Sequence, residues 1–574
     1  MILLLILLTV PSYILWTLIC LEINHRRASR MGIPLIRIPV DFFNVPFQVF
    51  EPFLWSTLSF FNIPLPYCAR YMKRGWHFTE KARSHLELGP VFAFVTPKEV
   101  SVQLCDPEAI HEVWGRRADF PRPARNYELL SVYGPSISTA SPENWARHRK
   151  VLASPFGNEA VMRSVWDESV RQTQQMMHAW TISGIGSISA DMRAVSLNVL
   201  AATGFRRAFD FKASGKTGVG SETTLGKEEE TTGRFSYRDA LQIVLDNAIL
   251  ILLIPRKHLQ YSFLPAWMRR IGKAAEDFYV HMQELLREEV AAANRGEKGS
   301  GSLITAFERA LDEHDRDKTK GLSADEILGN LFVINFAGHD TTANTLAFAA
   351  LLLAAHPEVQ DWIAEEINAA LQGLGEGEGS YGELFPKLVR CRAVMLETLR
   401  LFPPIMSLPK ITTVSQAQTL RVGDREITLL PDTFILSSVL GTHTHPDYWS
   451  DPLTWQPTRW IESKFNPPEV LPRYLQTGDS PFEERIRAPV RKAYFPWSDG
   501  PQNCPGLKFS EVEFVAVLAY LFREHRIETV SEAGETGEQA RERTKKVVND
   551  CEATMLLKMR DADRVNVKFV TARK

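Results

Sequence analysis

The stretch PWSDGPQNCPG, residues 496–506, decides how the chain is to be interpreted. Its single cysteine, Cys504, follows Gly500 by four residues and precedes Gly506 by two, and a helical pattern over residues 507–522 begins there. A glycine-rich loop that leads into a helix directs backbone N–H groups and the positive end of the helix dipole toward the sulfur. A lone cysteine is usually a small buried apolar residue. This setting instead predicts a lowered thiol pKa and a thiolate, the form of cysteine that binds iron.

A second informative stretch, residues 324–355, is apolar almost all round and predicts one buried helix of about 32 residues and roughly 48 Å. Ser323 and Glu326 form a capping box at its start, and Pro357 ends it. The middle of the helix carries GHDTT, residues 338–342. A threonine in a helix often donates only to a carbonyl one turn earlier, which would be a structural role. An acid at the centre of a buried helix, however, costs several kcal/mol unless it is satisfied or functional, so a site is expected there.

Two pairs of residues have spacings that place each pair on one helix face. Trp145 and Arg149 are four residues apart, and Glu397 and Arg400 are three apart. The second pair alone carries little information, because most such pairs are solvated surface neighbours.

These segments, in this order and with these spacings, resemble the motifs of the cytochrome P450 family over roughly residues 50–570. The resemblance implies a mainly α fold with smaller β-sheets, in which a long central helix crosses a helical domain that binds haem b. It implies that Cys504 is the axial ligand of the haem iron, and that Trp145 and Arg149 contact the haem propionates.

The resemblance also assigns roles to five other residues. Thr341 would hold dioxygen at the iron, and Asp340 would relay protons to it from solvent. Glu397, Arg400 and Arg459 would form a buried charge triad that fixes the loop around the cysteine. The triad is expected to have a structural role. Only Thr341 and Asp340 are expected to be catalytic.

Three residues depart from the family pattern around the cofactor. Trp497 stands where the family usually has Phe, and Gln502 stands where an Arg commonly pairs a propionate. Lys410 occupies a position that often holds Arg or His for the same purpose. With Gly506, these residues complete the expected cofactor-binding set. The departures bear on how the propionates are held, and not on ligation by the cysteine.

The activity implied by the resemblance is that of a haem-thiolate monooxygenase, which inserts one oxygen atom from O2 into a lipophilic small molecule. The sequence holds no flavin or nicotinamide segment, so electrons from NADPH are expected to arrive through a NADPH–cytochrome reductase. Candidates for its docking face are Arg147, Lys150 and Lys508. Two alternatives stay open: a haem-thiolate peroxide isomerase or dehydratase, which the intact Asp340-Thr341 pair disfavours, and a catalytically silent haem-binding membrane protein.

The substrate itself is not named by the sequence. The cysteine loop is similar to that of fungal monooxygenases of secondary metabolism. Pocket candidates by resemblance are Tyr127, Leu130, Tyr133, Ile137, Phe332, Phe336, Ile405, Met406 and Leu408, each of which is equally suited to the core.

The N-terminus differs from the rest of the chain. Residues 1–21 carry no charge, and as a helix they would span about 31 Å, the thickness of a bilayer core. A basic cluster at 25–30 follows, which places the remainder in the cytosol. We expect a single-pass anchor at 1–22 in the endoplasmic reticulum membrane, a proline-containing linker at 23–50 and a haem domain at 51–574. A cleaved signal peptide is the alternative, but it would want basic residues before its apolar core.

The composition is that of an ordinary globular chain, with 574 residues, 45% hydrophobic, 23% charged and a net charge of −2. It gives no support for nucleic-acid binding. The six cysteines include no C-x-x-C pair, which excludes zinc fingers and fits a reducing cytosol. Residues 213–233 are rich in Gly, Ser, Thr and Glu and predict a mobile loop, in which no phosphate-binding motif is complete.

Overall fold

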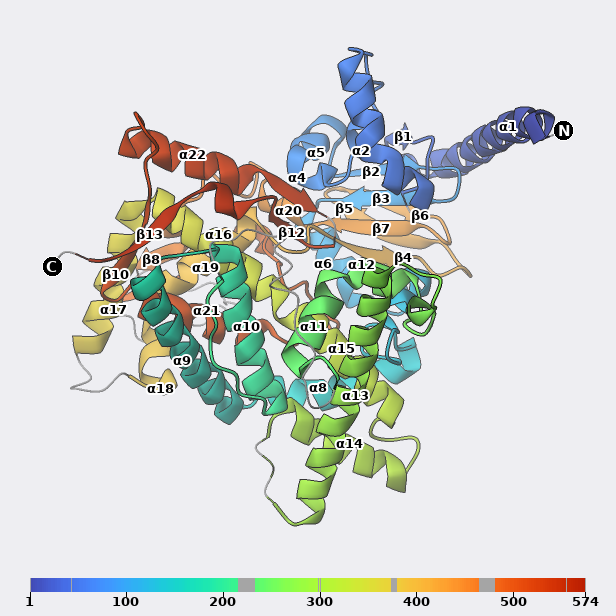
Figure 1. Ribbon diagram of the computed structural model, residues 1–574. Coiled ribbons are helices and arrows are strands. Elements are labelled where there is room, and N and C mark those ends of the chain that lie inside the picture. The colour runs from blue at the N-terminus through green and yellow to red at the C-terminus, as the bar shows by residue number, and fades with distance from the viewer. Residues whose placement is uncertain are drawn as a thin grey trace.

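The computed structural model describes residues 2–42, 44–214, 233–297, 299, 301–372, 379–463, 481–553 and 555–572, without the side chains of 2–8, 10 and 45. Almost all of the loop expected at 213–233 lies outside this described part. Helices make up most of the molecule, and the largest sheet lies at one edge, near the N-terminal helices (Figure 1). The prediction of a mainly α fold with smaller sheets is confirmed.

The helices are α1 Ile2–Ala28, α2 Val45–Phe60, α3 Ala69–Met72, α4 Trp76–Glu80, α5 Arg83–Leu88, α6 Pro107–Gly115, α7 Ala124–Tyr127, α8 Pro142–Phe156, α9 Glu159–Ser183, α10 Ile188–Phe205, α11 Tyr237–Asp246, α12 Ala248–Leu253, α13 Ala266–Asn294, α14 Leu303–Arg316, α15 Ala324–Gly338, α16 Asp340–Ala355, α17 Pro357–Gln372, α18 Tyr381–Leu384, α19 Val389–Leu401, α20 Val439–His443, α21 Leu507–Leu521 and α22 Gly537–Asn549.

The strands are β1 Leu35–Arg37, β2 Val91–Val95, β3 Val100–Leu104, β4 Ser407–Ile411, β5 Gln418–Val422, β6 Arg425–Leu429, β7 Phe434–Ser438, β8 Ile461–Ser463, β9 Glu484–Ile486, β10 His525–Thr529, β11 Cys551–Ala553, β12 Leu557–Met559 and β13 Val567–Thr571.

The largest sheet has the order β1-β2-β3-β7-β4, with β2 antiparallel to β3 and β3 parallel to β7. Its first strand lies inside the segment expected to be a linker, 23–50. Leu35 of β1 pairs with Ala93 of β2, and Ile38 just beyond is fully buried. This part of the expected linker therefore packs with the domain.

The helical core surrounds α16, which packs against α10, α19 and α22, while α21 runs along α9. Ala343, Leu346 and Leu351 show why α16 is central: they are almost fully buried although they point in different directions around the helix. A helix that is apolar on all sides is stable only when other elements cover every side.

The central helix differs from its prediction. Its capping box is present, with Ser323 Oγ accepting from Glu326 N and the Glu326 carboxylate accepting from Ser323 N. The single helix expected over 324–355 is instead two, α15 and α16, which are separated by His339 with φ −102° and ψ −45°. The sequence pattern missed the interruption because the apolar periodicity continues across it.

The two N-terminal helices, α1 and α2, project from the domain, and the N-terminus lies at the outer end of α1 (Figure 1). Within the residues described, no helix is long and apolar enough to cross a membrane. The C-terminal end of α1 packs on the domain, where Leu21 and Ala28 are buried.

Candidate active site

The cysteine loop is held by its own backbone in the turn before α21. The Cys504 N–H donates to the Trp497 carbonyl at 2.9 Å, and the Asn503 N–H donates to the Gly500 carbonyl at 3.2 Å. Gly500 has φ +69°, and a Cβ there would lie 2.8 Å from the carbonyl oxygen of Trp114. Only glycine satisfies both conditions. The loop thus presents the Cys504 side chain to a large cavity.

The electrostatics of the thiol differ from the prediction. Burial raises the pKa of Cys504, and the Gly506 N–H and the Arg149 guanidinium only partly oppose it. The expectation that the loop alone lowers this pKa is therefore wrong, because desolvation of a thiolate outweighs one N–H group and one nearby cation. A metal ion would displace the thiol proton directly. Trp497 packs beside the loop and donates from Nε1 to Ser510 Oγ at 3.1 Å.

Three cationic side chains lie next to this loop, and two of them, Arg122 and Arg149, line the cavity. Arg149 donates to the Asn503 carbonyl at 2.8 Å and to its side-chain oxygen at 2.6 Å. Arg122 donates to the carbonyls of Ile137 and Gln502, and Lys410 Nζ donates to Gln502 Oε1 at 2.6 Å. The carbonyl and amide groups that these cations contact carry no charge.

No acidic side chain pairs with these three cations anywhere in the described residues. Burial lowers the pKa of Arg122 and Arg149, and burial with repulsion from Arg122 and Arg117 lowers that of Lys410 to about 7. The indole N–H of Trp145 is also buried without a partner. Buried and half-buried cations without an anionic partner, together with an orphaned donor beside a cysteine, suit a cofactor that carries carboxylates, so the site fits haem. Arg122 was missed from the sequence because it precedes every recognised motif.

The expected charge triad lies behind the loop as a buried ion-pair network. Glu397 accepts from Arg400 through two bonds of 2.8 Å and from Arg459 Nε at 3.0 Å. The Trp460 indole and the Gln456 N–H donate to the same carboxylate. Arg400 is fully buried and also donates to three backbone carbonyls. Every oxygen and nitrogen of the network is thus satisfied, as a buried ion pair requires.

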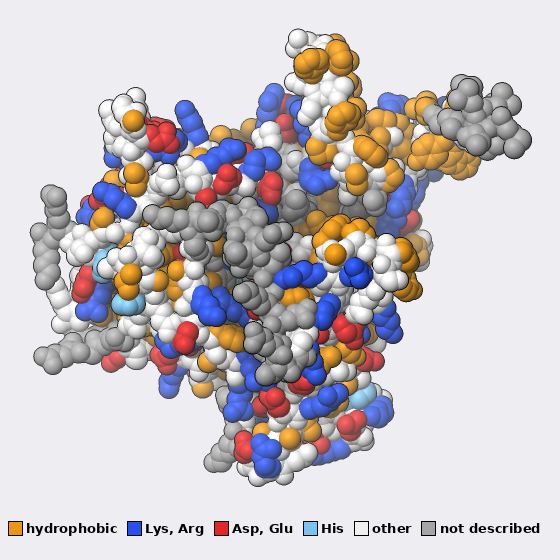
Figure 2. Space-filling model, in the orientation of Figure 1, with side chains coloured by type: hydrophobic (Ala, Val, Ile, Leu, Met, Phe, Trp, Pro, Cys, Tyr) orange, Lys and Arg blue, Asp and Glu red, His pale blue; other side chains and the backbone are white. Residues whose placement is uncertain are grey.

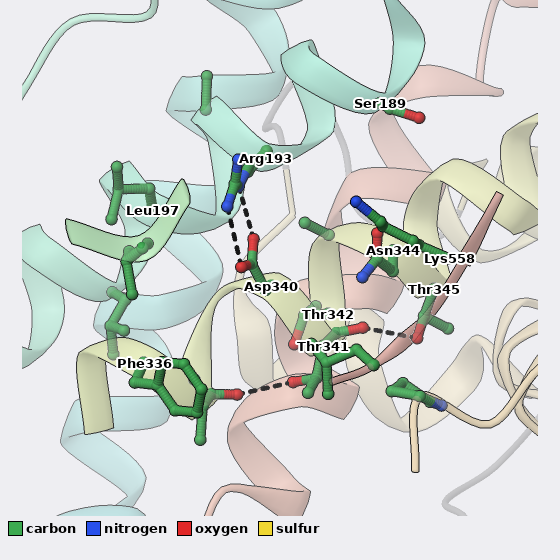
Figure 3. Close-up of a pocket in the computed structure, with 18 of the residues that line it drawn as sticks. Ser189, Arg193, Leu197, Phe336, Asp340, Thr341, Thr342, Asn344, Thr345 and Lys558 are labelled. Atoms are coloured by element: carbon green, nitrogen blue, oxygen red, sulfur yellow. Dashed lines mark hydrogen bonds and ion pairs between the residues drawn. The ribbon is translucent and has the colours of Figure 1, made fainter. Parts of the chain in front are cut away.

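The catalytic pair expected on the central helix also lines the cavity. Thr341 Oγ1 donates to the Ala337 carbonyl at 3.0 Å. Asp340 is held in a fork by Arg193 of α10, with Nε to Oδ1 at 2.6 Å and Nη2 to Oδ2 at 3.0 Å (Figure 3). Arg193 also pairs with Asp246 of α11. Burial would raise the pKa of Asp340, but His339 and Arg193 outweigh it and hold that pKa well below its usual range.

The cavity itself has a volume of about 2620 Å³, well above the 300–1,000 Å³ that holds one drug-sized ligand. Its wall combines apolar side chains with polar ones, among them Ser189, Arg193, Asn344 and Lys558 (Figure 3). Of the predicted pocket residues, those on this wall are Tyr127, Ile137, Phe336, Ile405 and Leu408.

Four of the predicted pocket residues do not line the cavity, namely Leu130, Tyr133, Phe332 and Met406. Tyr133 shows the reason: its hydroxyl donates to the Ala275 carbonyl at 3.0 Å, and its ring packs against Phe278 and Phe332 in the core. An aromatic residue near a site is read equally well as core or as lining until the packing is seen.

Comparisons with known proteins agree with this geometry. A cytochrome P450 monooxygenase of Arthrobotrys oligospora is 28% identical over 96% of this chain and 95% of its own length. The monooxygenase of a phomenoic acid biosynthesis cluster in Leptosphaeria maculans is 28% identical over 89% of this chain and 90% of its own. The solved haem domain of cytochrome P450DA has the same fold, with a TM-score of 0.63, 17% identity and coverage of 88% and 95% of the two chains.

The family model named Cytochrome P450 matches residues 64–549, which include every motif described above. A match of this extent, together with a cysteine loop that faces a large cavity, identifies the chain as a member of the cytochrome P450 family and as a monooxygenase with haem-thiolate iron.

Proposed function

We propose that this monooxygenase inserts one atom of dioxygen into a lipophilic small molecule, with electrons from NADPH delivered by a separate NADPH–cytochrome reductase. The observation that carries the proposal is the set of large apolar side chains that line the same cavity as Cys504, namely Leu200, Val333, Ile334, Phe336, Leu399, Ile405 and Leu408. Apolar lining of this kind favours ligands with apolar surface, because burial of that surface supplies binding free energy.

Haem, once bound, supplies the activation of dioxygen through its thiolate-ligated iron. The residues of the chain position the substrate and move protons. The Thr341 hydroxyl donates to the Ala337 carbonyl, which leaves its oxygen able to accept a hydrogen bond from a group in the cavity. Asp340 lies one residue away and reaches the polar part of the cavity, so it connects Thr341 to solvent. The Arg193 fork must loosen before either Asp340 oxygen can carry a proton.

The proposed pathway is the synthesis of a secondary metabolite. The relative from Leptosphaeria maculans, which is named for a phomenoic acid biosynthesis cluster, supports this assignment. The lipophilic substrate proposed from the cavity wall agrees with it.

The proposed location is the endoplasmic reticulum membrane, with one N-terminal anchor and the haem domain in the cytosol. Residues 1–21 lack charged side chains, and a basic cluster follows them. In the described part of α1 and α2, large apolar side chains are exposed, among them Tyr13, Trp16, Phe50 and Phe53. Figure 2 shows hydrophobic side chains gathered on these two projecting helices. Such surface favours a bilayer over water.

The proposed docking face for the reductase contains Lys150 and Lys508. Lys150 is exposed, and Lys508 is half-buried with its Nζ 4.2 Å from the centre of the Phe385 ring. Arg147, the third residue expected there, is taken up elsewhere: it forms a buried ion pair with Glu326, and its side chain is only 19% exposed. We therefore leave Arg147 out of the docking face.

The test is reconstitution of the full-length protein with reductase, NADPH and ¹⁸O-labelled dioxygen, in the presence of a lipid extract of the producing organism. The proposal expects a product with one labelled oxygen that requires both the reductase and NADPH. Turnover of a hydroperoxide without reductase would show a peroxide isomerase instead. A thiolate-type haem spectrum without any consumption of dioxygen would show a silent haem protein.

A further inference from the structure

The residue that interrupts the central helix has an unusual environment. The His339 side chain is fully buried, and it does not line the cavity. Its Nδ1 lies 2.8 Å from the Asn335 carbonyl oxygen. Its Nε2 lies 3.1 Å from Asp340 Oδ1, outside the alignment of a good hydrogen bond, and has no other partner. Both ring nitrogens thus face acceptors.

A neutral imidazole has only one N–H group and cannot serve two acceptors. If Nδ1 donates to the Asn335 carbonyl, an unprotonated Nε2 would direct its lone pair at a carboxylate oxygen, which is repulsive. Besides the proton on Nδ1, the His339–Asp340 pair must therefore hold one further proton, either on His339 Nε2 or on the Asp340 carboxylate. The fork from Arg193 favours the ionised carboxylate over a protonated one, which leaves the ring as the group of the pair that would hold this proton.

The charged groups here form an alternating chain. The His339 ring is followed by the Asp340 carboxylate, then by the Arg193 guanidinium of α10 and the Asp246 carboxylate of α11. These are the charged side chains that pair around the ring within the described residues. Because Arg193 already bonds Asp246, it keeps an anionic partner when it moves away from Asp340.

We propose that His339 stores the proton that Asp340 delivers to the cavity during oxygen reduction; this rests on the proposed function and adds a residue to it. In the step, the Nε2–H bond of His339 breaks and an O–H bond forms at Asp340 Oδ1. That proton then passes to a water or hydroxyl in the cavity. The ring is reloaded by the reverse path, because Asp340 is the residue of the pair that lines the cavity.

The chain contains a matched histidine that lacks this property. His148 of α8 is also buried, with Nε2 3.3 Å from Glu326 Oε1, and Glu326 is likewise paired to an arginine. Its Nδ1, however, lies 2.9 Å from the Asn330 amide nitrogen, which is a donor. One nitrogen faces a donor and the other an acceptor, so this ring is neutral. Burial lowers the pKa of His148, in agreement with a neutral ring.

The direct test is ¹⁵N NMR of histidine-labelled, full-length, haem-loaded protein in its diamagnetic, reduced carbon monoxide form. His339→Gln and His148→Gln assign the two rings, with His339→Asn as a second choice if the glutamine variant does not fold. At neutral pH we expect two protonated-type nitrogen shifts for His339 and one of each type for His148. A neutral His339 ring overturns the proposal. This readout needs no turnover, so it stands even if the proposed function fails.

The functional test uses reductase, NADPH and dioxygen without added substrate. His339→Gln keeps an N–H donor toward Asp340 but removes the acid. We expect it to slow NADPH oxidation roughly 10²-fold, to flatten the pH profile and to change the solvent isotope effect, as loss of one positioned proton donor does. His339→Gln/Asp340→Asn should be no slower than the slower single variant, because the two act as a unit. Unchanged kinetics in His339→Gln, or an equal loss in His148→Gln, would contradict the storage role.

Discussion

Position 502 carries an uncharged amide, and the cations around it show how the chain compensates. Gln502 accepts from Lys410 through its side chain and from Arg122 through its carbonyl, so both cations contact the same residue of the cavity wall. The departures seen in the sequence at 410 and 502 therefore belong to one cluster. Lys410 and Gln502 are 92 residues apart, and no local pattern could have paired them.

Arg122 is expected to contribute to cofactor retention. Replacing it with Ala should speed haem loss to an apoglobin acceptor about 10-fold to 100-fold, the range for a charge-assisted hydrogen bond of roughly 1.5–3 kcal/mol. Arg125→Ala is the matched control, because Arg125 pairs with Glu99 and does not line the cavity. Equal rates of haem loss in the two variants would show that the site does not depend on Arg122.

The two threonines of GHDTT are expected to behave differently. Thr341→Ala should still consume NADPH and dioxygen but release hydrogen peroxide, because the hydroxyl that guides protons in the cavity is gone. Thr342→Ala should have a much smaller effect, since that side chain also lines the cavity but lies about 100° from Thr341 around the helix. Peroxide yield per NADPH measures the difference. If Thr341→Ala stays fully coupled, the proton route does not pass this residue.

At the scale of elements, some features of the central helix could be predicted from the sequence and one could not. The capping box and the apolar pattern predicted where the helical segment begins and ends and that it is buried, but not that it consists of two helices. The interruption could not be predicted from the sequence, because it involves hydrogen bonds from side chains to backbone carbonyls. The His339 ring bonds to the Asn335 carbonyl, and the Thr341 hydroxyl donates to the Ala337 carbonyl. These bonds keep the carbonyls satisfied where helical hydrogen bonding is disturbed.

Helix α21 carries a buried acid that should make stability depend on pH. Glu513 is fully buried beside Ser196, and burial raises its pKa to about 8. Its folded-state pKa lies above the unfolded value, so the stability it contributes is full below about pH 4.5 and is lost as the pH rises through about 8.

Over that window the free energy of unfolding should fall by about 1 kcal/mol per pH unit on account of this group. Glu513→Gln, which resembles the protonated acid, should remove this part of the slope. Urea denaturation of the haem-loaded protein at pH 6, 7 and 8 measures it. Parallel pH dependences in the two proteins would mean that Glu513 is ionised when folded.

At the scale of the whole molecule, the projecting N-terminal helices account for membrane association. Deletion of residues 2–19 keeps Leu21 and Ala28, which pack on the domain. We expect most of the protein to leave the membrane fraction, with a remainder held by α2 that Phe50→Asp/Phe53→Asp releases. Haem content should be unchanged, because no residue of either helix whose side chain is described lines the cavity. If the protein with both the deletion and the two substitutions stayed on membranes, the membrane contact would lie outside these two helices.

The most direct test of the whole account is the difference spectrum of the reduced protein with carbon monoxide. Cys504 is the cysteine that faces the cavity, whereas Cys391 is fully buried in α19. The wild-type protein and Cys391→Ser should both show the Soret band of a thiolate ligand. Cys504→Ser should lose that band, because an alcohol is a poor anionic donor at neutral pH. A thiolate band that survives in Cys504→Ser but disappears in Cys391→Ser would contradict the account at its centre.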